Sequence, residues 1–282
     1  MNISEKITAL RRLMEQQGWD AAVIPGTDPH GSEYLPERWQ QRKWISGFTG
    51  SFGTVVVTHT HAGLWTDTRY FIQARKELEG TEFELHPLRV PDAVDYPQWL
   101  AASLPAGSVT CIDGECMTYR QVMALHQSVR ANAGSVVDRP SYLDDIGRDK
   151  PPLPLSPVFV LEPKYCGRET EEKIQWLRRE LFNGDCSHIL LSGLDQIAWL
   201  FNIRSHDIPY NPVAIAYALV DSHNATLFIR EAKVGDSVKK TLRAQGVDIA
   251  PYESLKATLE SISPDSVFMA DGDTLNHSLF QF

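Results

Sequence analysis

Arg69 has the clearest potential for ligand binding in this sequence, because aromatic residues flank it. The run is Trp65-Thr-Asp67-Thr-Arg69-Tyr70-Phe71. An arginine among aromatic rings at the end of a strand can hold a carboxylate or a peptide carbonyl with its planar guanidinium. The polar segment Asp28-Pro-His30-Gly-Ser-Glu33-Tyr34 supplies a carboxylate, that of Glu33, which could orient the guanidinium. A surface salt bridge is the alternative, and the physical argument alone favours it.

Residue types that bind metals are present, but their spacing predicts no metal centre. His59-Thr-His61 could place two imidazoles on one face of a strand, although a hairpin turn explains this pair more simply. Cys186-Ser-His188 is interpreted as part of a core, and Asp271-Gly-Asp273 lacks the other ligands of a calcium loop. Neither His-Glu-x-x-His nor a paired Cys-x-x-Cys occurs. We therefore expect no metal ligands and no two-metal chemistry from these residues.

The glycine-rich run Gly47-Phe-Thr-Gly50-Ser-Phe-Gly53 also predicts structure and not catalysis. It does not match Gly-x-Ser-x-Gly, it lacks the lysine of a P-loop, and it leads into a predicted strand where a phosphate-binding loop leads into a helix. A tight turn with close backbone packing is the better interpretation.

Composition narrows the classes of function. The chain has 282 residues, of which 43% are hydrophobic and 22% charged, which is typical of globular proteins and long enough for two domains. Its net charge of −9 disfavours binding to nucleic acid or to an anionic membrane surface. The four cysteines are few and irregularly spaced, and residues 1–20 contain no secretory signal, so we expect a cytoplasmic protein with free thiols.

Hydrophobic periodicity predicts an alternating α/β pattern in the first half of the chain. A helix is expected over residues 4–17, with Ser4 as its N-cap and Gly18 at its end. A buried strand is expected next, then a hairpin, then a helix, a strand and a last helix. These elements are predicted over residues 21–24, 54–58, 63–66, 70–79, 108–113 and 119–131.

The second half repeats the order of the first: long helix, buried strand, short helix and a pair of strands. Residues 169–182, 187–191, 193–201, 213–220 and 225–229 carry these patterns. Between the halves, residues 138–157 are rich in proline and aspartate, which predicts a stiff connector that resists both helix and sheet. We therefore expect domains over residues 1–150 and 151–282. The last residues resemble the start of a helix, so we expect the sequence to be part of a longer chain.

Four motifs together resemble one family, the cytosolic Xaa-Pro aminopeptidases of the creatinase or pita-bread type. Three lie in the first half: Asp28-x-His30-x-Ser-Glu33-Tyr34, Trp44-Ile-Ser-Gly47-Phe-x-Gly50-Ser and Trp65-Thr-Asp67-x-Arg69-Tyr70-Phe71-x-Gln73-Ala74. The fourth, in the second half, is Gly193-Leu-Asp195-x-Ile-Ala-Trp199-Leu-Phe-Asn202-x-Arg204, followed by Asp207, Asn211-Pro212-Val213 and Ala216-Tyr217. The motifs occur in order over almost the whole chain and resemble the first two domains of the three-domain branch.

This resemblance implies an α/β fold of two successive creatinase N-terminal-like domains, which have a ribonuclease-H-like design, each with a mixed sheet flanked by helices. In that family a C-terminal pita-bread domain binds two metal ions, usually manganese, through two Asp, one His and two Glu. That domain removes an N-terminal residue that precedes proline. Because these ligands have no counterparts in the sequence, we expect the catalytic domain to be absent from this chain and no residue here to be catalytic.

The resemblance further implies that the chain is the non-catalytic N-terminal part of such an enzyme, where it shapes substrate access and the contacts of a homodimer. Peptides with proline at the second position would be the substrates. Arg69 is then expected to contact the peptide, Glu33 to support Arg69, and His30 to be a further substrate-binding residue. Two alternatives stay open: a peptide- or histone-binding head of a peptidase-like chaperone, and a creatinase-like amidinohydrolase. The 282-residue chain alone is expected to be inactive, even with manganese.

Overall fold

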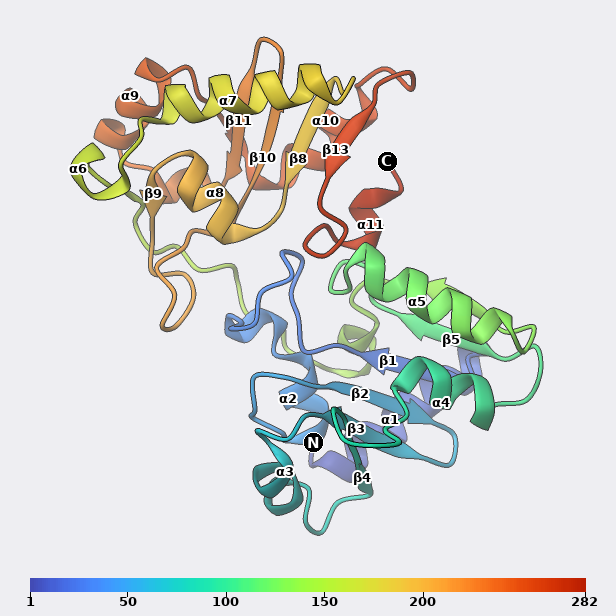
Figure 1. Cartoon of the computed structure of the whole chain (residues 1–282). Coiled ribbons are helices and arrows are strands. Elements are labelled where there is room, and N and C mark those ends of the chain that lie inside the picture. The colour runs from blue at the N-terminus through green and yellow to red at the C-terminus, as the bar shows by residue number, and fades with distance from the viewer. The chain divides into compact units, whose positions relative to one another are not determined.

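The computed structural model describes residues 1–282 and divides them into two units (Figure 1). The first unit consists of Met1–Asp28 and Glu37–Pro152. The second consists of Pro29–Pro36 and Leu153–Phe282. The short segment Pro29–Pro36, which carries His30 and Glu33, therefore belongs to the second unit although it comes from the first half of the sequence.

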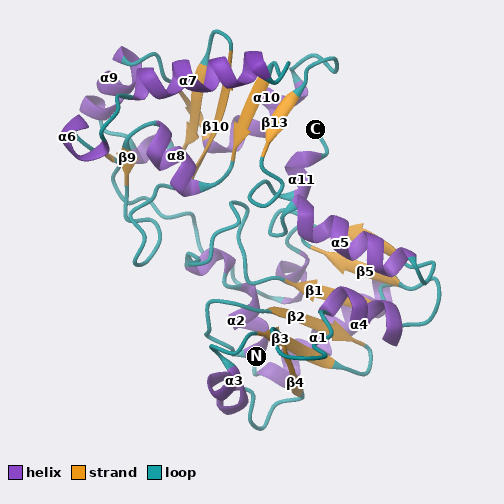
Figure 2. Ribbon diagram, in the orientation of Figure 1, coloured by secondary structure: helices purple, strands orange, loops and turns teal.

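A mixed sheet forms the centre of the first unit, with the strand order β4-β3-β2-β1-β5-β6 (Figure 2). Strand β1 runs antiparallel to β2 and parallel to β5, and β2 and β3 form an antiparallel hairpin. The outer strands β4 and β6 each run parallel to their neighbour. The strands are β1 (Ala21–Ile24), β2 (Thr54–Thr58), β3 (Ala62–Thr66), β4 (Phe83–Pro87), β5 (Val109–Ile112) and β6 (Ser135–Asp138).

Helices cover both faces of this sheet. Alternation along β1 sends Ala22 and Ile24 into the core that α1 and α2 complete, while Ala21 and Val23 enter the core under α4 and α5. Apolar residues at helical spacing on α1 and α5 account for this packing, as their periodicity predicts. The helical elements are α1 (Ile3–Gln17), η1 (Glu37–Trp39), α2 (Gln41–Ser46), α3 (Phe71–Glu77), α4 (Tyr96–Ser103), α5 (Tyr119–Arg130) and η2 (Tyr142–Ile146).

The second unit is built on a five-stranded mixed sheet with the order β12-β11-β10-β8-β13. Helices α7, α8 and α9 contribute to the core on one face, and α10 and α11 contribute to the core on the other. A two-stranded ribbon of β7 and β9 lies outside this sheet. The strands are β7 (Phe159–Val160), β8 (His188–Leu191), β9 (Ile203–Arg204), β10 (Ala216–Asp221), β11 (Ala225–Ile229), β12 (Asp248–Pro251) and β13 (Phe268–Ala270). The helical elements are α6 (Pro163–Cys166), α7 (Thr170–Asn183), α8 (Leu194–Leu200), η3 (Glu231–Lys233), α9 (Asp236–Ala244), η4 (Tyr252–Ser254), α10 (Leu255–Glu260) and α11 (His277–Phe280).

The two sheets share one topology, which confirms the predicted repeat. The pairs β1–β2 and β8–β10 are antiparallel, as are the hairpins β2–β3 and β10–β11. The pairs β3–β4 and β11–β12 are parallel, as are β1–β5 and β8–β13. Strand β6 is the one addition in the first unit. The α/β class with mixed sheets flanked by helices is confirmed.

The start of α1 differs from the prediction. Its N-cap is Asn2, not Ser4: the amide of Glu5 donates to Asn2 Oδ1 (2.9 Å), and the amide of Asn2 donates to Glu5 Oε2 (2.8 Å). This reciprocal capping box satisfies two otherwise unpaired backbone groups, which Ser4 alone cannot do. The predicted end is confirmed, since Gly18 adopts the left-handed conformation with φ 70°.

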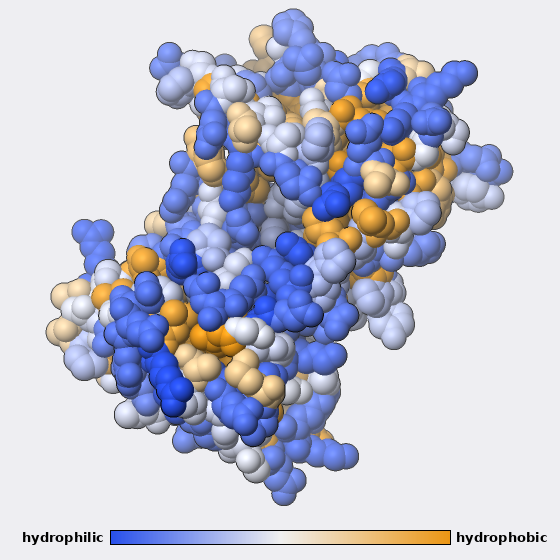
Figure 3. All heavy atoms as spheres, turned by 180° about the vertical axis from the view of Figure 1, so that it is seen from behind, coloured by the Kyte–Doolittle hydropathy of each residue, from blue (hydrophilic) through white to orange (hydrophobic).

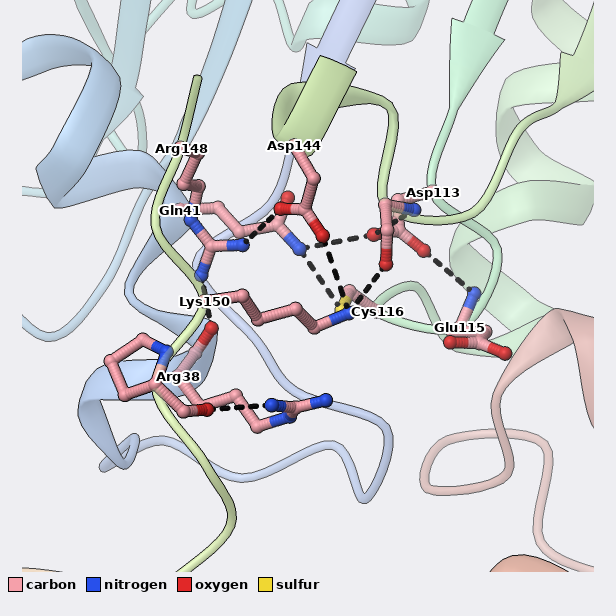
Figure 4. Close-up of polar contacts among 10 residues, drawn as sticks. Arg38, Gln41, Asp113, Glu115, Cys116, Asp144, Arg148 and Lys150 are labelled. Atoms are coloured by element: carbon pink, nitrogen blue, oxygen red, sulfur yellow. Dashed lines mark hydrogen bonds and ion pairs between the residues drawn. The ribbon is translucent and has the colours of Figure 1, made fainter. Parts of the chain in front are cut away.

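The proline-rich segment 138–157 was predicted to be a connector without helix or strand. The structure shows more order than that. Strand β6 ends at Asp138, and the 3₁₀ helix η2 forms between the prolines. Polar contacts then fix residues 148–151 to the first unit (Figure 4). Arg38 Nη1 donates to the carbonyl of Pro151 (2.6 Å), Arg148 donates to Asp144 (3.2 Å) and to the carbonyl of Arg38, and Lys150 donates to Ser141 Oγ (2.5 Å).

The surface is largely polar. Hydrophilic residues cover most of the face seen in Figure 3, and apolar residues gather there in small patches. No helix of the described chain combines the length and apolar character that crossing a bilayer demands.

Candidate functional site

The turn after β3 holds Arg69 against a buried carboxylate. Asp67 is 1% exposed and follows directly on the last residue of the strand. Both of its oxygens accept hydrogen bonds from Arg69: Nε donates to Oδ1 (3.0 Å) and Nη2 donates to Oδ2 (3.0 Å). The backbone amide of Arg69 also donates to Oδ1 (3.1 Å). These hydrogen bonds lower the pKa of the Asp67 carboxyl, so it is charged at neutral pH.

A second arginine shares the same carboxylate. Arg89, in the segment after β4, places Nη1 3.1 Å from Asp67 Oδ2. The parallel pairing of β3 with β4 brings these two segments together, because Thr66 lies opposite Pro87 in the ladder. Arg69 is 50% exposed and Arg89 is 66% exposed, so the two guanidinium groups face solvent while their shared anchor does not.

The glycine-rich turn 47–53 supplies an aromatic wall. The Phe52 ring lies 5.7 Å from the guanidinium carbon of Arg69 and 5.1 Å from that of Arg89. The predicted close backbone packing is present, since a Cβ on Gly53 would lie 2.8 Å from the carbonyl of Trp65. Buried Arg42 holds this turn by donating to the carbonyls of Gly53 (2.8 Å) and Gly50, and burial lowers the pKa of its guanidinium to about 10.

Tyr70 supplies a second aromatic ring beside Arg69. Its ring lies 5.2 Å from the guanidinium carbon of Arg69, and its hydroxyl shares a hydrogen bond with Ser51 Oγ (2.7 Å). We call Phe52, Asp67, Arg69, Tyr70 and Arg89 the arginine pair site. Two cations on one carboxylate leave a net positive charge, which suits a carboxylate or a polarised carbonyl and does not suit a metal ion.

Sequence reasoning found Arg69 but did not find Asp67. The hydrogen bonds described above show that Asp67 orients the Arg69 guanidinium. The role of Glu33 stays a prediction. The sequence could have indicated Asp67, because it lies only two residues before Arg69. It could not have indicated Arg89, because only the pairing of β4 with β3 brings that residue near.

His30 lies within the second unit, where it anchors the segment Pro29–Pro36. It is 2% exposed, and both ring nitrogens are engaged: Nδ1 donates to the carbonyl of Ser192 (3.0 Å), and Nε2 shares a hydrogen bond with the hydroxyl of Tyr252 (3.0 Å). The Tyr217 ring lies 4.4 Å away, centroid to centroid. Asn276 Nδ2 donates to the carbonyl of Pro29 (2.9 Å). This geometry gives His30 a positioning role, and a direct role in substrate binding stays a prediction.

Comparison with known families matches nearly the whole chain. Residues 6–145 and residues 149–282 each match a family described as the Creatinase/Prolidase N-terminal domain. Two such domains therefore follow one another along the sequence.

Individual relatives agree with this result. The chain is 38% identical over 258 residues to a probable Xaa-Pro aminopeptidase P of Pyricularia oryzae, covering 90% of this chain and 42% of the relative. It is 37% identical over 276 residues to the corresponding protein of Neurospora crassa, covering 97% and 40%. The crystal structure of X-prolyl aminopeptidase from Caenorhabditis elegans, described as a cytosolic enzyme with a di-nuclear active site, matches with a TM-score of 0.87 and 33% identity. That match covers 96% of this chain and 46% of the worm enzyme, so the chain spans less than half the length of these relatives.

Proposed function

Since the chain belongs to the Creatinase/Prolidase N-terminal domain family, with two such domains in succession, we propose that it is the non-catalytic N-terminal part of an Xaa-Pro aminopeptidase. Residues 1–150 and 151–282 form its two domains. The complete enzyme is then a cytoplasmic homodimeric metallopeptidase that removes an N-terminal residue preceding proline. Its two divalent ions, manganese in this proposal, bind to a domain outside these residues.

The observation that carries the proposal is the extent of the match to the relatives. Identity of 37–38% runs over at least 90% of this chain but over only 40–42% of the fungal relatives. The remaining length of those relatives is sufficient for a separate catalytic domain. In this arrangement the two domains described here shape substrate access and contribute to dimer contacts.

The arginine pair site is the part of the chain that we assign to the substrate. Proline at the second position leaves an amide without an N–H, so recognition depends on carbonyl groups, ring shape and charge. A guanidinium fixed by Asp67 can bind a peptide carbonyl or carboxylate in one direction, and a lysine ammonium cannot. Glu33 is proposed to support this contact and His30 to position its segment.

The test is kinetic and uses the full-length enzyme. Arg69→Ala is expected to lower kcat/KM for an Xaa-Pro peptide at least about tenfold, and Arg69→Lys is not expected to restore it. Arg75→Ala, an exposed arginine on α3, is the matched control. If Arg69→Ala keeps full activity, or loses it only in proportion to unfolding, the arginine pair site has no role in catalysis.

A second measurement tests whether hydrolysis requires a domain outside these residues. The purified 282-residue chain is expected to show no hydrolysis of an Xaa-Pro peptide with or without added manganese, because an activated water needs a clustered set of ligands outside these residues. Turnover that copurifies with this chain and depends on metal contradicts the proposal. A full-length protein that binds such peptides without cleaving them supports the peptide-binding head instead.

A further inference from the structure

Two histidines and a glutamate, none of which belongs to the arginine pair site, meet at the edge of the first sheet. His61 immediately precedes β3, while Glu84 and His86 lie on the edge strand β4. Residues two apart on a strand point to the same face, so Glu84 and His86 share one side. The register sets Gly63 opposite Glu84 and Trp65 opposite His86.

The three side chains converge closely enough to share one ion. Nε2 of His61 lies 3.0 Å from Nε2 of His86, and Nδ1 of His61 lies 3.9 Å from Glu84 Oε2. One ligand atom from each of the three lies within 4.8 Å of those of the other two. Two imidazole nitrogens bound to a tetrahedral zinc ion are about 3.4 Å apart, so small rotations of the rings suffice to bind one ion.

Glycine at position 63 makes this convergence possible. A Cβ at Gly63 would lie 2.8 Å from His61 Nε2 and 2.5 Å from Cζ3 of Trp65. The ring of His61 can therefore fold back toward β4 only where the strand carries no side chain. Indoles enclose the rest of the cluster: Trp65 stacks on His86 at 3.9 Å, and Trp99 of α4 lies 4.7 Å from His61, both between ring centroids.

The two imidazoles contact each other through their Nε2 atoms. Burial lowers the pKa of His86 to about 4, with a smaller contribution from His61, and burial also lowers the pKa of His61. Since the two Nε2 atoms lie 3.0 Å apart, one donates a hydrogen bond to the other in the metal-free chain. A metal ion can bind both Nε2 atoms once the proton of that hydrogen bond moves to Nδ1 of the same ring, because neutral imidazole is a good ligand for zinc, copper, nickel and cobalt.

We propose that His61, Glu84 and His86 form a binding site for a divalent transition-metal ion of the zinc type. The two histidines bind through Nε2, Glu84 supplies an oxygen from the exposed side, and water completes the coordination. The site would link the start of β3 to the edge strand β4. Its ligand set differs from the oxygen-rich sites that hard ions such as manganese and magnesium prefer.

Titration calorimetry on the tag-free, chelator-treated 282-residue chain tests this proposal. Zn²⁺ is expected to bind one-to-one, with Mn²⁺ and Mg²⁺ at least about tenfold weaker. His61→Gln and His86→Gln are each expected to weaken Zn²⁺ binding at least about tenfold, and Glu84→Gln by less. His59→Gln, an exposed histidine on the same hairpin, is the matched control and should bind as the unaltered chain does. Gly63→Ala keeps all three ligands but should still weaken binding.

The visible spectrum of bound Co²⁺ tests the site in the unaltered chain, so this test does not require any variant to fold. Co²⁺ bound to the unaltered chain should show the intense visible bands of a tetrahedral nitrogen and oxygen site. Three outcomes overturn the proposal: no saturable Zn²⁺ binding, binding that survives both histidine changes, or a thiolate-to-cobalt band that assigns the ion to the cysteines. Failure here leaves the proposed peptidase function unaffected, because no step of that function uses these residues.

Discussion

The two units share a sheet topology but use a cation on a buried aspartate in opposite ways. In the first unit Asp67 is buried and its two arginines, beyond the ends of β3 and β4, are at least half exposed. In the second unit Lys233, four residues beyond the end of β11, pairs with Asp207, and neither side chain is exposed at all. An ion pair on a buried aspartate therefore has exposed cations in one unit and a fully buried cation in the other.

Asp207 shows what the closed version does. Besides Lys233 it accepts a hydrogen bond from the amide of Ile215 (2.8 Å), so it fixes the irregular segment before β10. Both charged groups of this pair have partners within the fold. In the arginine pair site, by contrast, the two guanidinium groups are at least half exposed. Exposure of the cations, and not the presence of an ion pair, distinguishes the two arrangements.

Removing the buried cation should have the largest effect. Lys233→Met leaves the Asp207 carboxylate buried without its counter-charge, and we expect a loss of about 3–5 kcal/mol in the free energy of unfolding. Urea denaturation of the chain followed by circular dichroism measures this loss.

Lys239→Ala is the matched control, because this lysine on α9 pairs with exposed Glu231 and should cost at most about 1 kcal/mol. The combined change Lys233→Met with Asp207→Asn should recover part of the stability. A loss below about 1 kcal/mol for Lys233→Met would show that the pair is no more structural than a surface salt bridge.

Strong local patterns explain which elements were predictable. Helices α1 and α7 and both hairpins carry clear periodicity, and each was expected within a few residues of its observed bounds. The patterns gave no element over 83–87, 135–138, 248–251 or 268–270, where the structure has β4, β6, β12 and β13. These are short edge strands with half-exposed residues, so they lack the apolar run on which a strand prediction depends.

The residues of the candidate sites were likewise predictable only where their partners lie close in sequence. Arg69 was predictable because its aromatic neighbours adjoin it in sequence. Arg89 reaches Asp67, and His86 reaches His61, only through the pairing of β4 with β3. Because β4 itself gave no signal, neither partnership could be inferred from the sequence. His61 was paired with His59 in the sequence interpretation, whereas the structure brings it to His86.

A smaller loss is expected when the open pair loses its anchor. Asp67→Asn removes the charge and turns an amide donor toward two guanidinium groups, which should cost about 1–3 kcal/mol in the free energy of unfolding. Asp95→Asn, at the exposed N-cap of α4, is a control that changes the same residue type and keeps the cap. A loss as large as that of Lys233→Met would remove the distinction between the two units.

Asp67 should also make the stability of the chain depend on pH. Because the pKa of Asp67 is lowered in the folded state, its contribution is fully present above the unfolded value, about 3.9, and is lost as pH falls through the folded value. The unaltered chain should therefore lose more stability than Asp67→Asn between pH 5 and the acid limit of folding. Equal losses in the two proteins would mean that Asp67 titrates alike when folded and unfolded.

The smallest effect on stability is expected from Arg69 itself. Arg69→Ala removes a guanidinium that is half exposed, and Arg89 still neutralises Asp67, so the free energy of unfolding should fall by no more than about 1 kcal/mol. Arg69→Ala combined with Arg89→Ala should lower the free energy of unfolding by more than the sum of the single changes. Only the double change leaves the buried carboxylate without a cation. Urea denaturation of the four proteins in this cycle gives the coupling directly. Additive losses would show that the two arginines stabilise the fold independently of one another, and they would then not act as a pair on Asp67.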